Sequence, residues 1–186
     1  MKVSSALVGH HSNFSRCDYL YIMEETKPIK RSKELAPLSR EHHDGLLFAW
    51  KIKKGLANGT PIETLGNYTR WFWTNHLESH FRDEENVLIR SLPGNDPLVR
   101  QMVKEHADIR DLICSLDKVP NANSLQLLTE LINKHIRFEE RKLFPYAEQV
   151  LTPEQLQEIY IHLPNKSQCN SEWNEEFWLS KPVRTK

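Results

Sequence analysis

Cysteine, glycine and net charge are all scarce in this chain of 186 residues, and each shortage excludes a class of protein. Three cysteines, an odd number without a CxxC pair, argue against a disulfide framework and for a reducing compartment. Six glycines, and ten prolines that fall mainly between periodic segments, are typical of a helical protein. A formal net charge of zero removes the broad electrostatic case for binding nucleic acid or an acidic membrane surface.

Long apolar runs are also missing. No stretch approaches the roughly 18 residues of a transmembrane helix, and residues 1–15 lack the apolar core of a signal peptide. We therefore expect a cytoplasmic protein with no membrane partner. The length favours one domain with a core large enough to fold without disulfides. We expect a flexible N-terminal segment over 1–33, a helical domain over 34–163 and a C-terminal tail over 164–186.

Apolar residues at three- and four-residue spacing predict four long amphipathic helices. The first is expected over about 39–57, because Pro37 should block an earlier start and Ser39 can cap. The others are expected over about 61–90, 97–117 and 124–150. The second should start at a capping box in Thr60-Pro61-Ile62-Glu63. Pro145 should kink the fourth helix or end it near Phe144.

Short polar links between these segments predict an all-α fold, an antiparallel up-and-down four-helix bundle. Thr152-Pro153-Glu154-Gln155 is expected to cap a short fifth helix that ends near Leu163. The tail carries Trp173, Phe177 and Trp178. It is either a strap packed on the bundle, the interpretation we prefer, or a docking segment for a partner. Cys114 is expected to be buried as a small hydrophobic side chain.

Histidines and glutamates interrupt the apolar faces of these helices. The pattern His-x-x-x-Glu-Glu occurs at residues 80–85 and again at 135–140. Residues four apart share one face of a helix, so each pattern aims an imidazole and a carboxylate at one point. Burying such groups costs several kcal/mol unless they are paired or bound. The predicted metal ligands are therefore four histidines and two glutamates: His42, His80, Glu84, His106, His135 and Glu139.

This mixed set of imidazoles and carboxylates suits a pair of first-row transition-metal ions, with the two carboxylates placed to bridge them. Iron is the preferred occupant because of its redox chemistry. Zinc usually takes four tetrahedral ligands and fits less well, and manganese also ranks below iron. Each ligand imidazole should donate its other N–H to an acceptor. Glu41, Glu85 and Glu140 are the candidate acceptors, and Tyr68 is expected to line the pocket.

Two further histidines are alternative candidates for metal ligands. His43 lies about 100° round the helix from His42 and could replace it. His76 lies one turn before His80 and could add a ligand or line the pocket. The remaining histidines, His10, His11 and His162, have the pattern of surface residues. A single inward histidine is more often a hydrogen-bonded core residue than a ligand, but that explanation does not account for the whole set in one small domain.

These segments resemble the hemerythrin-like family, the His-His-Glu cation-binding four-helix bundles. The likeness spans about residues 35–150. It is carried by Leu38-Ser39-Arg40-Glu41-His42, His80-Phe81-Arg82-Asp83-Glu84-Glu85, Glu105-His106-Ala107-Asp108, and His135-Ile136-Arg137-Phe138-Glu139-Glu140 followed by Leu143-Phe144-Pro145. The resemblance implies a non-heme di-iron centre with two carboxylate bridges, an oxo or hydroxo bridge and an open position for O₂. It implies the same six ligands, with Glu84 and Glu139 as the bridges.

The chain departs from the O₂-carrying hemerythrins at two positions. Met102 stands where they have a second histidine one turn before the third-helix ligand. On the last helix, His135-x-x-x-Glu139 stands where they have His-x-x-x-x-Asp. Five histidines become four, unless His76 supplies the missing one, so the resemblance does not extend to simple reversible O₂ carriage.

Three functional hypotheses follow. The leading one is a di-iron protein that binds or senses a small ligand such as O₂, NO or peroxide, or that handles iron. The second is an oxidase or peroxidase that uses the same centre. The third is an interaction module, stabilised by metal, whose tail engages a partner through Trp173, Phe177 and Trp178. Binding is preferred to catalysis because the sequence shows no nucleophile–base pair and no loop for an organic cofactor.

Overall fold

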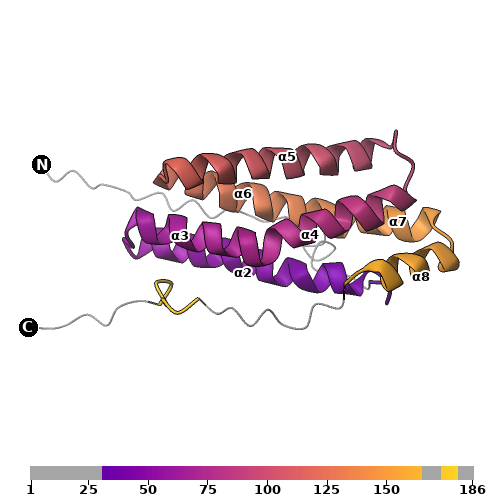
Figure 1. The fold of residues 1–186 in the computed structure, drawn as a ribbon, viewed down its shortest axis with the longest axis horizontal. Coiled ribbons are helices and arrows are strands. Elements are labelled where there is room, and N and C mark those ends of the chain that lie inside the picture. Colours follow the sequence, from indigo (N-terminus) through magenta and orange to yellow (C-terminus); the bar gives the residue numbers. More distant parts are fainter. Residues whose placement is uncertain (1–30, 165–172, 180–186) are drawn as a thin grey trace, which may run out of the picture. The chain divides into compact units, whose positions relative to one another are not determined.

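The computed structural model describes residues 31–164 and 173–179, and these residues form helices with no strand among them (Figure 1). The α-helices are α2 (Ala36–Ala57), α3 (Ile62–Phe72), α4 (Glu78–Asp83), α5 (Pro97–Lys118), α6 (Ala122–Phe138), α7 (Phe144–Val150) and α8 (Pro153–His162). None of the described helices combines the length and the apolar composition needed to cross a bilayer. The expectation of a flexible segment over 1–33 falls almost entirely outside the described residues.

The second and fourth predicted helices are each built from several pieces. The second runs through α3, the π-helical turn η1 (Trp73–Leu77), α4, a further π-helical turn η2 (Glu84–Leu88) and the 3₁₀ turn η3 (Ile89–Ser91). The fourth joins α6 to α7 through the π-helical turn η4 (Glu139–Leu143). Single π turns inside α-helices are often found at functional sites. Two of the three begin at Glu84 and Glu139, the carboxylates predicted to bridge the metals.

Three local predictions were wrong. Helix α2 begins at Ala36 rather than Ser39, because Pro37 lies in the first turn, where no backbone N–H is needed. Thr60 forms no capping box: Pro61 is the N-cap of α3, and the Thr60 hydroxyl donates to the Phe177 carbonyl at 3.5 Å. Cys114 is exposed rather than buried.

The ends of the later helices agree better with the predictions from the sequence. Pro145 does not end the fourth helix, because it falls in the first turn of α7, directly after the π turn. The Asp96 side chain caps α5 by accepting from the Leu98 N–H at 2.7 Å. The predicted capping box of the fifth helix is present between Thr152 and Gln155.

Two apolar clusters fill the bundle. One contains the start of α2 and the start of α5, together with η2 and α7; the other contains the opposite ends of α2 and α5, together with α3 and α6. His42, Glu84 and His106 fall between residues of the two clusters, and the other predicted ligands lie close to the same boundary. This distribution of helix ends agrees with an antiparallel up-and-down order, which stays a prediction.

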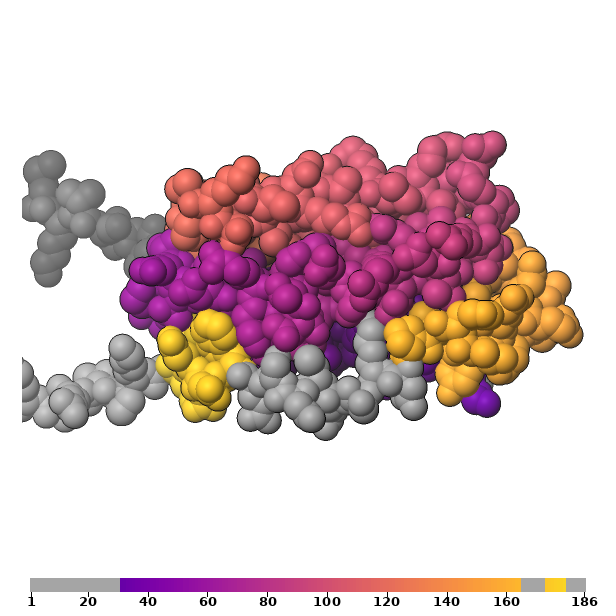
Figure 2. All heavy atoms as spheres, in the orientation of Figure 1, coloured from indigo at the N-terminus to yellow at the C-terminus, as the bar shows by residue number. Residues whose placement is uncertain are grey.

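The described part of the tail packs on the bundle, as the strap interpretation predicts. The rings of Trp173 and Phe177 lie 5.3 Å and 5.1 Å from the Tyr68 ring. Asn58 Nδ2 donates to the carbonyl of Phe177 at 3.0 Å. A Cβ atom at Gly55 would lie 2.7 Å from Phe177 Cδ2, so a side chain there would displace the segment. Figure 2 shows this segment in yellow against the purple surface of α3.

Candidate metal centre

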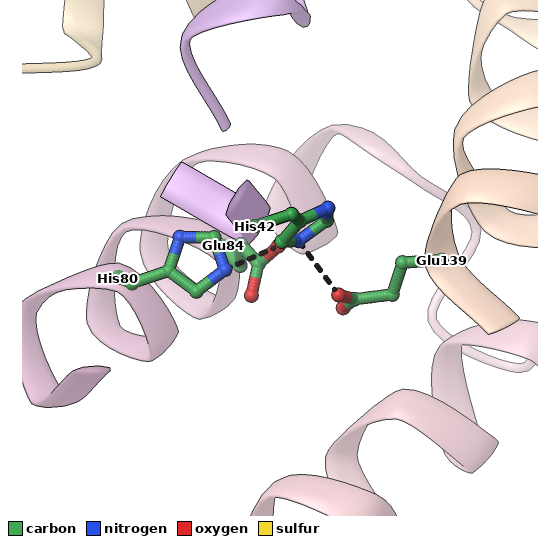
Figure 3. Close-up of side chains that lie close together, drawn as sticks. All are labelled: His42, His80, Glu84 and Glu139. Atoms are coloured by element: carbon green, nitrogen blue, oxygen red, sulfur yellow. Dashed lines mark ion pairs between the residues drawn. The ribbon is translucent and has the colours of Figure 1, made fainter. Parts of the chain in front are cut away.

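The structure brings the six predicted ligands together in the interior of the bundle. His42 comes from α2, His80 from α4, His106 from α5 and His135 from α6, while Glu84 and Glu139 are the first residues of η2 and η4. None of the six is more than 5 % exposed. They form two groups whose ligand atoms lie within 4.8 Å of one another: His42, His80, Glu84 and Glu139, and Glu84, His106, His135 and Glu139. Figure 3 shows the first group.

Glu84 belongs to both groups. Its Oε1 atom lies 3.4 Å from His80 Nε2 and 3.7 Å from His42 Nε2. Its Oε2 atom lies 3.3 Å from His106 Nε2. One carboxylate therefore directs one oxygen into each group, which is the placement that a bridging ligand needs.

Glu139 also belongs to both groups, but here a single oxygen lies close to both of them. Its Oε2 atom lies 3.1 Å from His42 Nε2 and 3.2 Å from His135 Nε2, and its Oε1 atom lies 3.9 Å from His106 Nε2. The Nε2 atoms of His106 and His135 are 3.1 Å apart. All four imidazoles thus turn Nε2 towards the two carboxylates.

The other ring nitrogen of each histidine meets a glutamate from a neighbouring helix. His42 Nδ1 lies 2.6 Å from Glu140, and His106 Nδ1 lies 2.7 Å from Glu85. A carboxylate can only accept, so each Nδ1 carries the proton and each Nε2 is left as the ligand atom. Glu85 and Glu140, two of the acceptors expected from the sequence, are in place.

His80 and His135 have the same kind of partner. Glu41 lies 3.1 Å from His80 Nδ1, as the sequence suggested, and Glu105 lies 3.1 Å from His135 Nδ1. Glu105 was missed. A repeated pattern could have found it: an acid precedes the inward histidine in both Glu41-His42 and Glu105-His106, and in each case that acid binds the histidine of the next helix along the chain.

We expect Glu105→Gln to lower the affinity for a cation by about 10- to 100-fold, the usual effect of losing a partner of a ligand histidine. The amide cannot act as an anionic acceptor for His135 Nδ1–H, although Gln101 can still contact the new side chain. Competition with a chelator measures the change. Asp108→Asn on the same helix is the control, because Asp108 pairs with Lys104 on the surface, and equal losses in both variants would contradict the role of Glu105.

Two phenylalanine rings close the sides of the centre. Phe81 stacks on His106 with ring centroids 3.7 Å apart, and Phe144 stacks on His42 at 5.3 Å. Neither phenylalanine is exposed. These rings fix the tilt of the imidazoles and exclude water from their faces, which strengthens electrostatic interactions in the interior.

The charges of the centre stabilise one another. Burial alone would lower the pKa of His42, but three surrounding carboxylates hold it well above its ordinary value. Burial likewise opposes the charge on His106, whose pKa Glu84 and Glu85 nevertheless raise to about 9. The reverse holds for Glu84, because burial would raise its pKa and the neighbouring imidazoles keep it well below the usual range. A cation would compete with protons for these nitrogens, so its binding should release protons.

The donor set fits a pair of cations. All four carboxylate oxygens of Glu84 and Glu139 are buried, as is His42 Nε2, and among the described residues none of these five atoms has a hydrogen-bond partner. Their contacts are ion pairs with imidazole nitrogens at 3.1–3.9 Å. Two carboxylates buried at one centre repel each other and are costly to desolvate, and bound metal ions would relieve both effects.

The other residues considered as ligands or as lining of the pocket lie outside this centre. His43 is exposed on α2. His76 stands outside both groups and stacks on Phe72 at 5.0 Å. Tyr68 belongs to the cluster under the tail segment, twelve residues from His80 and so roughly 18 Å away along a helix, and it does not line this centre. His162 is exposed, and His10 and His11 fall outside the described residues.

One of three comparisons with known proteins matches the part of the chain that holds the centre. A family model described as the hemerythrin HHE cation binding domain matches residues 40–147, more than half of the chain. All six predicted ligands and their four outer glutamates lie inside the matched region. Searches of curated proteins and of solved structures found no match.

Proposed function

We propose that this chain, which belongs to the hemerythrin HHE cation-binding family, holds two iron ions in an antiparallel up-and-down bundle and binds or senses a small ligand such as O₂, NO or peroxide. The observation that supports the proposal is the sharing of Glu84 and Glu139 by two groups of buried ligand atoms. Each group supplies two imidazole nitrogens and two carboxylate oxygens. His42 and His80 would serve one ion, and His106 and His135 the other.

Iron is proposed because of the donors in each group. Two histidines with carboxylates are a typical set for non-heme iron that keeps coordination positions for an external ligand. With four protein donors, zinc would be a closed tetrahedral site. Iron, when bound, supplies redox chemistry and affinity for small ligands. The protein supplies the rest: four imidazoles held by outer carboxylates, and a surrounding shell from which water is excluded.

The contacts of the tail argue against a docking role. Trp173 and Phe177 lie against Tyr68 of the same chain, and Lys51 Nζ lies 3.8 Å from the centre of the Trp178 ring. Aromatic side chains engaged in this way cover the bundle rather than offering a free surface. A partner would have to displace them, so the interaction-module hypothesis finds less support.

Anaerobic loading with Fe²⁺, followed by metal analysis and an optical spectrum on exposure to O₂, tests the proposal. We expect about two iron ions per chain and an absorption band from an oxygen bridge between ferric ions. The double variant His80→Ala/His135→Ala removes one donor from each group and should retain almost no iron. Less than about one ion per chain in the unmodified protein, with no such band, would reject a di-iron centre. Steady consumption of O₂ or peroxide by the loaded protein would instead indicate an enzyme.

A further inference from the structure

We propose that Arg31, which lies outside the family match, is a positioning residue of the metal centre, and that Arg110 has the same role on the opposite side. Each arginine binds the glutamate that holds a ligand histidine, and each also covers the phenylalanine stacked on that same histidine. The inference rests on the proposed function. It adds that the chain just before α2 controls the alignment of His42, one of the ligands of the first cation.

Arg31 reaches the centre through Glu140. Its Nη2 atom donates to Glu140 Oε2 at 2.7 Å, while Glu140 Oε1 accepts from His42 Nδ1 at 2.6 Å. The two oxygens of one carboxylate are thereby used by two different partners. The Arg31 side chain is only 6 % exposed, so solvent screens this ion pair little. A second ion pair, to Glu148 at 3.3 Å, holds the other end of the guanidinium.

The backbone of η4 leaves a carbonyl that needs a donor from outside the helix. In a π turn, a carbonyl accepts from the N–H five residues later, and the residue five after Glu140 is Pro145, which has no N–H. Arg31 Nη2 donates to the Glu140 carbonyl at 2.7 Å and supplies the missing donor. One guanidinium therefore fixes both the side chain and the backbone of Glu140, directly after the shared ligand Glu139.

The same guanidinium also contacts the phenylalanine that stacks on His42. The Arg31 Cζ atom lies 5.0 Å from the centre of the Phe144 ring, and Phe144 stacks on His42. Arginine is suited to this double contact because its planar group can stack on a ring and donate in its own plane. His42 is thus held along its edge through Glu140 and across its face through Phe144, and both supports lead back to Arg31.

Arg110 makes a similar but more exposed contact at His106, because its side chain is 33 % exposed. Its Nη2 atom lies 2.8 Å from Glu85 Oε1, which also accepts from His106 Nδ1 at 2.7 Å. Its Cζ atom lies 5.4 Å from the centre of the Phe81 ring, which stacks on His106. Each cation would therefore have one histidine supported in this way, His42 in one group and His106 in the other.

The test uses the full chain loaded with Co²⁺, which shifts the NMR signals of protons close to the metal. The unmodified protein should give four shifted signals that exchange with water, one for each ligand Nδ1–H. In Arg31→Gln, we expect the His42 signal to broaden or vanish through faster exchange while the other three stay. Arg110→Gln should remove a different one of the four. In competition with a chelator, each variant should lose one ion about tenfold more readily, at the low end of the range for a residue beyond the ligands.

Two further variants serve as controls for this test. Arg70→Gln, which breaks an exposed pair with Asp117, should leave all four signals and both affinities unchanged. Arg31→Lys keeps the charge but cannot bind Glu140, its carbonyl and Glu148 together, so it should recover only part of the affinity. Full recovery by lysine would overturn the positioning role in favour of charge alone. Four unchanged signals in Arg31→Gln would overturn the inference and leave the cation pair intact, whereas a protein that binds no Co²⁺ and no Fe²⁺ would overturn the proposed function itself.

Discussion

Glu139→Gln is expected to abolish the binding of both cations rather than one. Its Oε2 atom lies close to His42 of one group and His135 of the other, and its Oε1 atom lies on the side of His106. An amide has one oxygen and an NH₂ group, so it cannot offer an anionic donor to two ions at once. We expect the iron content to fall from about two ions per chain to almost none. The loss of affinity should be at least about 100-fold, because losing even a residue that only supports a ligand can cost that much.

Metal analysis after loading, with chelator competition, measures this loss. Glutamine has nearly the size of glutamate, so we expect the circular dichroism of the helices to be unchanged. Glu130→Gln is the matched control, because Glu130 lies on the exposed face of α6 and bonds only to Gln126 among the contacts of its carboxylate that the structure describes. A variant Glu139→Gln that still held one tightly bound ion would show that the carboxylate is not shared.

Removal of the cations is expected to lower the thermal stability of the protein by a large amount. A ligand that binds only the folded state at about 1000 times its Kd adds about 4 kcal/mol. In a chain of this length, each kcal/mol raises Tm by roughly 2–4 °C. One tightly bound ion should therefore raise Tm by roughly 8–16 °C, and a second ion should add to this. The physical source is the pair of buried carboxylates, Glu84 and Glu139, whose charges the cations neutralise.

Calorimetry of the loaded protein, and of the same sample after treatment with a chelator and dialysis, measures the difference in Tm. Glu139→Gln supplies an internal control, since its Tm should not respond to added iron. Equal values of Tm for loaded and stripped protein, at a measured content of two ions per chain, would show that the folded and unfolded states bind iron equally well. The buried carboxylates would then need another source of stabilisation.

Most of the inward residues could be predicted from the sequence because helix periodicity is local. Spacing alone placed His42 and His106 on the apolar faces, and the His-x-x-x-Glu units placed His80 with Glu84 and His135 with Glu139. The structure brings all six together. Their role as ligands stays a prediction, since convergence alone does not identify the ion.

Capping and turn geometry were less predictable. Thr60 has the sequence of a capping residue, yet its hydroxyl donates to a carbonyl of the tail, 117 residues away. The π turns at Glu84 and Glu139 were not expected at all. A π turn replaces an i→i+4 hydrogen bond by one of i→i+5, and the spacing of apolar residues along the chain does not show where this happens.

The sequence by itself determined that four amphipathic helices carry histidines and glutamates on their buried faces, because side-chain direction along a helix follows from a period of 3.6 residues. Only the tertiary structure decided which glutamate meets which histidine, that Glu105 joins the set, and that Arg31 reaches Glu140. Those contacts cross between helices. They depend on the relative height and rotation of elements that are far apart in the chain, which no local period contains.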